Sequence, residues 1–225
     1  KKYILGLWQS MLISLCSLIL IPCSFISCRG DEIVFPAEYE VLPIESRELT
    51  SFAPNEPIGM YLLNEGNMGS NKATIDYLDF CNGCYVRNIY GERNPNVIKE
   101  LGDVGNDLQI YGNRLYAVIN CSHKVEVMDL QARHIGQINI PNCRYMAFYG
   151  DKMYVSAYVG SIAGPELLGS VYEVDTATLQ ITREVKVGHQ PDEMCLSNNK
   201  LYVCNSGGYL VNQYDSTISV VDIHS

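Results

Sequence analysis

The chain has 225 residues, and 16 Lys and Arg against 25 Asp and Glu give it a net charge of -9 at pH 7. An acidic surface repels phosphate backbones, and no cluster of Lys or Arg offsets this, so nucleic acid is not an expected partner. The only Trp is Trp8, near the start of the chain, which argues against repeat families that carry a Trp in every unit.

Residues 1–27 have the order of a secretory signal peptide. Lys1 and Lys2 form a short basic start, and residues 3–27 carry no charge. The segment ends in apolar residues, a serine and then Cys28, which is the order of a lipobox. We therefore predict cleavage before Cys28 and lipidation of its thiol. Because the chain starts without Met, we also expect residues before Lys1.

Two alternatives to this leader remain open. The uncharged stretch is long enough to span a membrane as an anchor. Cys23 is a second candidate for lipidation, although Pro22 before it is a poor cleavage residue. Asp31 and Glu32, soon after Cys28, resemble the surface-export signal of Bacteroidota lipoproteins. That resemblance implies an outer-membrane protein, held in the membrane by its lipid anchor and facing the cell exterior.

Two motifs repeat in residues 59–225, which follow a proline-containing tether at residues 28–58 with one strand expected near residues 39–42. The first motif is an apolar residue, a Tyr and two mostly apolar residues; the second is a short strand that ends in Asp. The four terminal aspartates are 50, 46 and 47 residues apart, close to the period of about 40–50 residues of a four-stranded propeller blade. The first motif lies at residues 60–63, 115–118, 153–156 and 201–204, and the aspartates are Asp79, Asp129, Asp175 and Asp222.

This repeat predicts an all-β fold, a β-propeller of four-stranded blades. About four blades are expected, at residues 59–103, 104–141, 142–188 and 189–225. We expect them to belong to a larger, seven-bladed ring, because four blades without the last strand would leave open sheet edges. A β-sandwich is the structural alternative, and no stretch shows helical periodicity with caps. Each recurring Asp is expected to accept backbone N–H groups of the following turn.

The last unit resembles the YncE-type propeller repeats. Residues 188–194, 200–208 and 217–222 follow that family's usual G-x-x-P, K-x-L-Y-V-x-N-S-G and T-V-S-V-I-D pattern. The leader and residues 63–67, 105–107 and 209–214 are similar to surface propeller lipoproteins of Bacteroidota, the BtuG group, which capture cobalamin and related corrinoids for a TonB-dependent outer-membrane transporter. The resemblance implies a binding protein rather than an enzyme, with a possible corrinoid as ligand and no other cofactor.

Ligands of propellers sit on the face built by two sets of loops, those that enter each inner strand and those that join the second and third strands. Here these loops are rich in Asn, Gly, Ser and Tyr, which supply hydrogen bonds and flat contact area. The alternative role for Asn64, Asn120 and Asn205 is to cap turns. We expect a small-molecule ligand to contact Asn67, Asn106, Asp107, Arg144, Tyr145, Tyr158, Asp192, Glu193 and Tyr209.

The cysteines and histidines do not have the spacing of a metal site. Cys81 and Cys84 flank a hairpin turn, which favours a local disulfide or two free thiols over redox catalysis. Cys121, Cys143, Cys195 and Cys204 are expected to be small core residues. No nucleophile elbow, P-loop or dinucleotide motif is present, so no catalytic residue is predicted. The alternative functions are a propeller enzyme, either a lactonase or a glycan-active protein, and a protein-binding scaffold.

Overall fold

The structure is a computed structural model that describes residues 39–41, 56–97, 100–159 and 167–224. The predicted signal peptide, Cys28 and most of the predicted tether lie outside these ranges. Within the described ranges, no helix is both long and apolar enough to cross a membrane. The elements are β1 (Tyr39–Val41), β2 (Gly59–Asn64), β3 (Thr74–Asp79), β4 (Cys84–Val86), α2 (Ile89–Arg93), β5 (Gly105–Tyr111), β6 (Arg114–Ile119), β7 (Lys124–Asp129), β8 (His134–Asn139), β9 (Cys143–Tyr149), β10 (Lys152–Ala157), β11 (Ser170–Asp175), β12 (Ile181–Lys186), β13 (Pro191–Ser197), β14 (Lys200–Asn205) and β15 (Thr217–Asp222).

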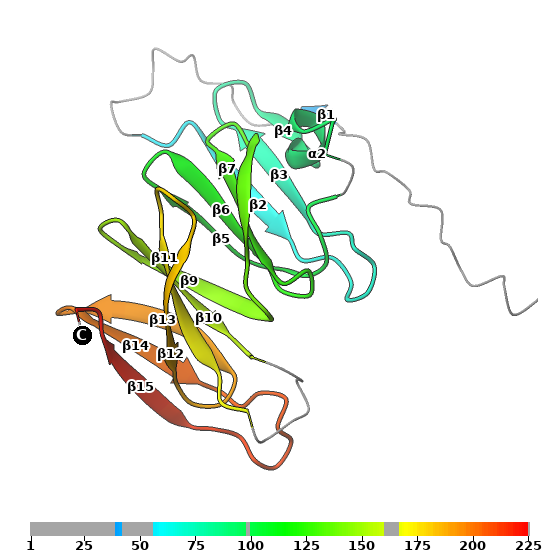
Figure 1. Cartoon of the computed structure of the whole chain (residues 1–225). Coiled ribbons are helices and arrows are strands. Elements are labelled where there is room, and N and C mark those ends of the chain that lie inside the picture. Colours follow the sequence, from blue (N-terminus) through cyan, green and yellow to red (C-terminus); the bar gives the residue numbers. More distant parts are fainter. Residues whose placement is uncertain (1–38, 42–55, 98–99, 160–166, 225) are drawn as a thin grey trace, which may run out of the picture. The chain divides into compact units, whose positions relative to one another are not determined.

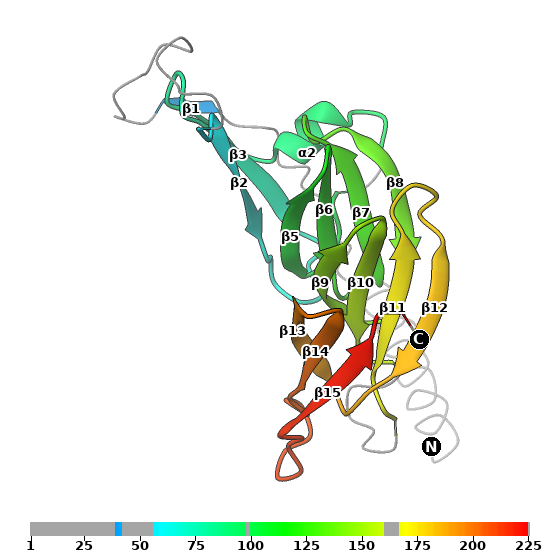
Figure 2. The same cartoon turned by 90° about the vertical axis from the view of Figure 1, so that its left-hand side faces the viewer.

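The strands form four antiparallel sheets that follow one another along the chain. Their strand orders are β1-β4-β3-β2, β5-β6-β7-β8, β12-β11-β10-β9 and β13-β14-β15, which we name blades 1 to 4. Neighbouring blades meet through their inner strands, because β2 contacts β5, β5 contacts β9 and β9 contacts β13. The chain is therefore an open β-propeller of four blades, as predicted (Figures 1 and 2). The alternative of a β-sandwich is wrong, because a sandwich has only two sheets packed face to face and this chain has four successive sheets.

Face-to-face packing of the blades explains why the middle strands are buried on both sides. Successive side chains of a strand point to opposite faces. In β6, Leu115, Ala117 and Ile119 join the cluster packed between blades 1 and 2, whereas Tyr116 and Val118 join the one between blades 2 and 3. Burying each such side chain is worth roughly 1.5–3 kcal/mol. Each blade thus depends on its neighbours for its core.

Blade 1 departs from the repeat in two ways. Its copy of the Tyr motif lies on the inner strand β2, whereas the other three copies lie on the second strands β6, β10 and β14. The short helix α2, which sequence periodicity did not predict, follows β4. The Asn88 side chain caps it by accepting the Gly91 N–H at 3.1 Å, and the Tyr90 hydroxyl donates to Glu126 of blade 2 at 2.8 Å. The helix thereby fastens blade 1 to blade 2.

The cysteine predictions are only partly correct. Cys143 is buried, as expected, and Cys81 and Cys84 are both free thiols. The prediction that Cys195 and Cys204 are core residues is wrong, because both are exposed. Strand alternation places them on the opposite face of blade 4 from Leu201 and Val203, which pack against blade 3.

The four recurring aspartates have the structural role that the sequence predicted. In each, the Oδ1 atom accepts the backbone N–H of the residue two positions later, at 2.7 Å in Asp79, 2.9 Å in Asp129, 3.0 Å in Asp175 and 2.9 Å in Asp222. The Thr178 backbone N–H, the Lys152 ammonium and the Thr178 hydroxyl lower the pKa of Asp175 to about 2. These carboxylates close the turn after the strand that ends in Asp, which is β3 in blade 1 and the third strand in blades 2 to 4.

Candidate functional site

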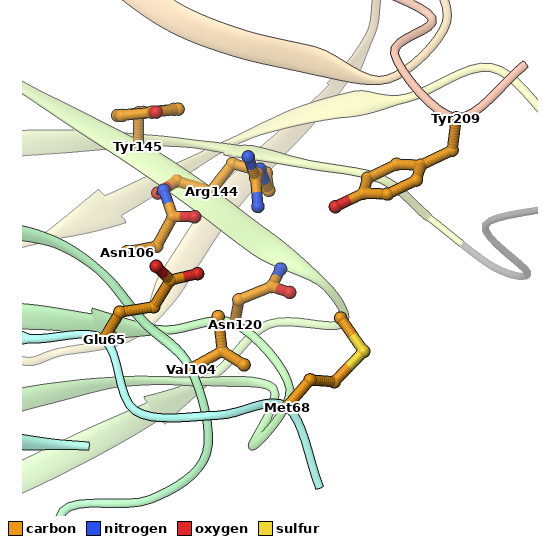
Figure 3. Close-up of a pocket in the computed structure, with 9 residues that line it drawn as sticks. Glu65, Met68, Val104, Asn106, Asn120, Arg144, Tyr145 and Tyr209 are labelled. Carbon is orange, nitrogen blue, oxygen red and sulfur yellow. The ribbon is translucent and has the colours of Figure 1, made fainter. Parts of the chain in front are cut away.

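Residues from all four blades line one cavity of about 270 Å³ (Figure 3). Blade 1 contributes its β2–β3 loop, blade 2 the start of β5 and the end of β6, blade 3 the start of β9, and blade 4 its β14–β15 loop. The loop sets that the sequence singled out therefore do converge. The lining residues are Glu65, Met68, Val104, Gly105, Asn106, Asn120, Arg144, Tyr145 and Tyr209.

The inner strands of blades 2, 3 and 4 begin with the same backbone device. The residue just before each strand has a positive φ, and its carbonyl accepts the N–H of the first residue after the second strand of the same blade. The φ values are 60° at Val104, 48° at Asn142 and 47° at Gln190, and the bonds come from Asn120, Tyr158 and Ser206 at 2.8, 3.1 and 3.2 Å. This conformation is costly for a β-branched residue such as Val104. It brings the entering and joining loops of each blade together at the pocket.

Close backbone approach joins the loop of blade 1 to blade 2. The Gly105 N–H donates to the Glu65 carbonyl at 3.0 Å. A Cβ atom at Gly105 would lie only 2.8 Å from a methyl carbon of Leu63, so glycine allows β5 to start this close to β2.

A series of side chains then links the inner strands one to the next. The second residue of the inner strand is Asn106 in β5, Arg144 in β9 and Asp192 in β13. The Asn106 amide donates to the Arg144 carbonyl at 2.6 Å, and the Arg144 Nε donates to Asp192 Oδ1 at 3.0 Å. The Asn120 amide adds a bond to the Cys143 carbonyl at 2.8 Å, which is a contact between blades rather than the turn cap considered from the sequence.

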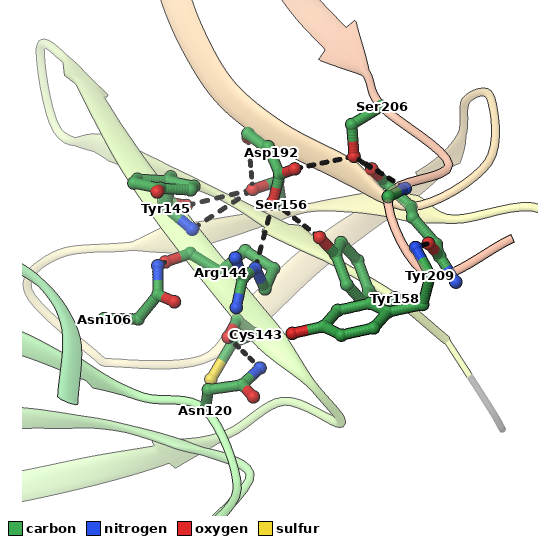
Figure 4. Close-up of polar contacts among 12 residues, drawn as sticks. Asn106, Asn120, Cys143, Arg144, Tyr145, Ser156, Tyr158, Asp192, Ser206 and Tyr209 are labelled. Carbon is green, nitrogen blue, oxygen red and sulfur yellow. Dashed lines mark hydrogen bonds and ion pairs between the residues drawn. The ribbon is translucent and has the colours of Figure 1, made fainter. Parts of the chain in front are cut away.

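The Asp192 carboxylate is held by donors from three directions (Figure 4). Besides Arg144, it accepts the Tyr158 hydroxyl on Oδ1 at 2.7 Å and the Ser206 hydroxyl on Oδ2 at 2.7 Å. The Ser156 hydroxyl donates to the Asp192 carbonyl at 2.8 Å. With its oxygens engaged, Asp192 positions other residues instead of offering itself to a ligand.

Two tyrosine rings flank the Arg144 guanidinium. Its central carbon lies 4.9 Å from the centre of the Tyr158 ring and 5.7 Å from that of Tyr145, within the range of cation–π attraction. Burial raises the pKa of Tyr158, and its hydrogen bond to Asp192 raises it further, so the phenol remains a donor. Burial alone would lower the pKa of Arg144, but the nearby Tyr158 and Asp192 outweigh it and the pKa is raised. Arg144 is thus a fixed, permanent cation.

The nine residues predicted to contact a ligand fall into three groups: four line the pocket, two hold Arg144 in place, and three do neither. Asn106, Arg144, Tyr145 and Tyr209 line the pocket, and Tyr158 and Asp192 hold Arg144 in place. Asp107 accepts the Gln109 amide and the Met146 N–H, both at 2.9 Å, and burial raises its pKa. Glu193 and Asn67 are exposed and outside the lining set.

Four lining side chains were not predicted. Glu65 and Met68 lie in the same loop as Asn67, the residue of that loop that was predicted. Asn120 was placed in a joining loop, but turn capping was the favoured role for it, and Val104 is marked by its positive φ, which the sequence does not reveal. The sequence therefore identified the loops that line the pocket, but not which residues of each loop do so.

The pocket offers recognition groups: amide oxygens, one carboxylate, one guanidinium and two phenols. Among the described residues, no three or more His, Cys, Asp or Glu side chains lie grouped as a metal site would require. Nor do the nine lining residues include a Ser, Thr, Cys, Lys or His. Their chemistry suits hydrogen bonding to a polar ligand.

No family model matches the chain, and no curated protein does. Among solved structures, the chain is similar to the computationally designed Ika8 protein, with 14% identity and a TM-score of 0.48 over 77% of this chain and 44% of that one. It is also similar to hydrazine synthase of Kuenenia stuttgartiensis, with 16% identity and a TM-score of 0.49 over 70% and 42%. The β-propeller domain of the Trilobed protease from Pyrococcus furiosus has 11% identity and a TM-score of 0.44 over 74% and 51%. The chain thus spans less than half the length of the first two.

The substitution Asp192→Asn tests whether this carboxylate organises the site. It keeps the shape of the side chain but removes the charge opposite Arg144, so we expect it to lower the free energy of unfolding by about 1–3 kcal/mol. The matched Asp151→Asn removes an exposed carboxylate away from this site and should change stability by less than about 0.5 kcal/mol. Urea unfolding of both variants makes the comparison, and equal effects would contradict the positioning role.

Proposed function

We propose that this protein is a surface-exposed binding protein that captures a small polar nutrient and passes it to a TonB-dependent outer-membrane transporter. The observation that carries the proposal is the pocket to which all four blades contribute, with a guanidinium fixed at its wall. In blades 2, 3 and 4 the same backbone hydrogen bond joins the loop that enters the inner strand to the loop after the second strand, which also supports the proposal.

Preorganisation supports a binding role over a purely structural one. Asn106 and Asn120 are held by backbone carbonyls, and Arg144 is held by Asp192 between two rings. Side chains already fixed in the free protein lose little conformational freedom when a ligand arrives, which favours affinity. The proposal involves binding without chemical conversion.

The corrinoid form of this proposal rests on the resemblance of the repeats and the leader. A corrin ring is too large to enter a cavity of about 270 Å³. A corrinoid would therefore cover the mouth of the pocket and insert one amide-bearing side arm. Tyr209, which is about half exposed at the rim, would then offer a flat face to the ring. Titration with cobalamin decides this form, and no binding at micromolar concentration would remove it.

The location that we propose depends on Cys28. Lipidation of that thiol after signal cleavage would hold the propeller at the outer membrane and outside the cell. In cells fed a radioactive fatty acid, we expect the label on the wild-type protein and on Cys23→Ser, and its loss from Cys28→Ser. Label that follows Cys23, or that neither substitution affects, would contradict the anchor assignment.

Capture of a ligand by the whole protein tests the proposed function itself. We expect the immobilised protein to enrich a small molecule from culture medium, identified by mass spectrometry. Tyr209→Ala removes an aromatic wall of the pocket and should weaken binding roughly tenfold. Tyr214→Ala removes a more exposed ring of the same loop that lies outside the lining set, and should leave binding unchanged. No enrichment, or equal loss in both variants, would contradict the proposal.

A further inference from the structure

We infer that the pocket binds a zwitterion of amino-acid size, with the ligand ammonium at the Glu65 side of the pocket and the ligand carboxylate at Arg144. The inference rests on the proposed binding function and specifies its ligand class.

One side of the pocket is made of hydrogen-bond acceptors. Asn106 and Asn120 use their amide N–H groups on the carbonyls of Arg144 and Cys143. The Asn106 oxygen is left for a ligand, and the Asn120 oxygen, which accepts the Cys121 thiol at 3.5 Å, keeps a second lone pair for one. Among the described residues, no hydrogen bond or ion pair involves the Glu65 carboxylate, which points toward Asn106 (Figure 3). One carboxylate and two amide oxygens match an ammonium group, which has three donors and no acceptor.

The opposite side presents a donor of fixed geometry. The only bond of the Arg144 guanidinium to a described side chain uses Nε, which donates to Asp192. Its two terminal nitrogens therefore remain as a parallel pair of donors, the arrangement that binds a carboxylate through two hydrogen bonds. Because the side chain is only 16% exposed, water reaches these donors poorly, and a ligand carboxylate would satisfy them.

The charges distinguish a zwitterion from simpler ligands. Asp192 lies behind the lining and pairs with Arg144, so Glu65, Arg144 and Asp192 together carry one net negative charge, which disfavours a plain anion. A plain cation would satisfy Glu65 but leave the terminal nitrogens of Arg144 without a partner. A ligand with both charges satisfies the two walls at once.

Size and the remaining walls agree with this class. A cavity of about 270 Å³ lies just below the range of roughly 300–1,000 Å³ for small-molecule sites, which suits a ligand smaller than most. The lining also includes Met68, Val104 and the Tyr209 ring, which suit an apolar or aromatic side chain.

Blocked amino acids test the inference directly. Using the full chain, we would measure the thermal midpoint with a millimolar mixture of the proteinogenic amino acids whose side chains are uncharged, with the same mixture N-acetylated, and with the corresponding α-carboxamides. We expect the free amino acids to raise the midpoint, and both blocked mixtures to have little effect because each lacks one charge. No shift with free amino acids, or equal shifts with a blocked mixture, would overturn the inference.

Two variants then locate the charges. For the amino acid that binds best, we expect Glu65→Gln and Arg144→Lys each to weaken binding at least about tenfold, the loss of one charge-assisted hydrogen bond. The Glu65 side chain has no hydrogen-bond partner among the described residues, so its substitution does not endanger the fold. Asp151→Asn, which neutralises an exposed carboxylate outside the lining set, is the control. If the capture experiment returns a neutral or singly charged ligand, the zwitterion is excluded and the binding function stands. If it returns nothing, both fail.

Discussion

The whole architecture depends on sheets that are too small to bury their own apolar side chains. A strand such as β6 sends alternate residues into two different clusters, one toward blade 1 and one toward blade 3. Its burial is complete only when both neighbours are present. This requirement stacks the blades through their inner strands, and it places the loops that enter and join those strands around one cavity.

Within that arrangement, polar bonds between inner strands give the pocket its chemistry. Asn106, Arg144 and Asp192 are equivalent positions of successive blades, yet each has a different side chain. The differences make the bonds directional, from an amide to a carbonyl and from a guanidinium to a carboxylate. A repeat that is regular in its backbone thus carries an irregular, specific set of side chains where a ligand would lie.

Sequence reasoning succeeded where the determining forces are local or periodic. The aspartates that end one strand motif of each unit form short-range turn bonds, so their spacing was enough to predict blades. It failed where the outcome depends on contacts between blades. The exposure of Cys195 follows from which face of blade 4 meets blade 3, and the place of Glu65 in the pocket depends on the close approach of Gly105 to Leu63. No local pattern encodes either distance.

The central claim is that packing of the blades fixes Arg144 in place before a ligand arrives, through its bond to Asp192. A double-mutant cycle on the free energy of unfolding, with Arg144→Gln, Asp192→Asn and the double variant, measures that interaction most directly. We expect a coupling energy of about 1–3 kcal/mol, because removing either partner leaves the other poorly solvated and unpaired. Effects of the two substitutions that add to within about 0.5 kcal/mol would contradict the claim.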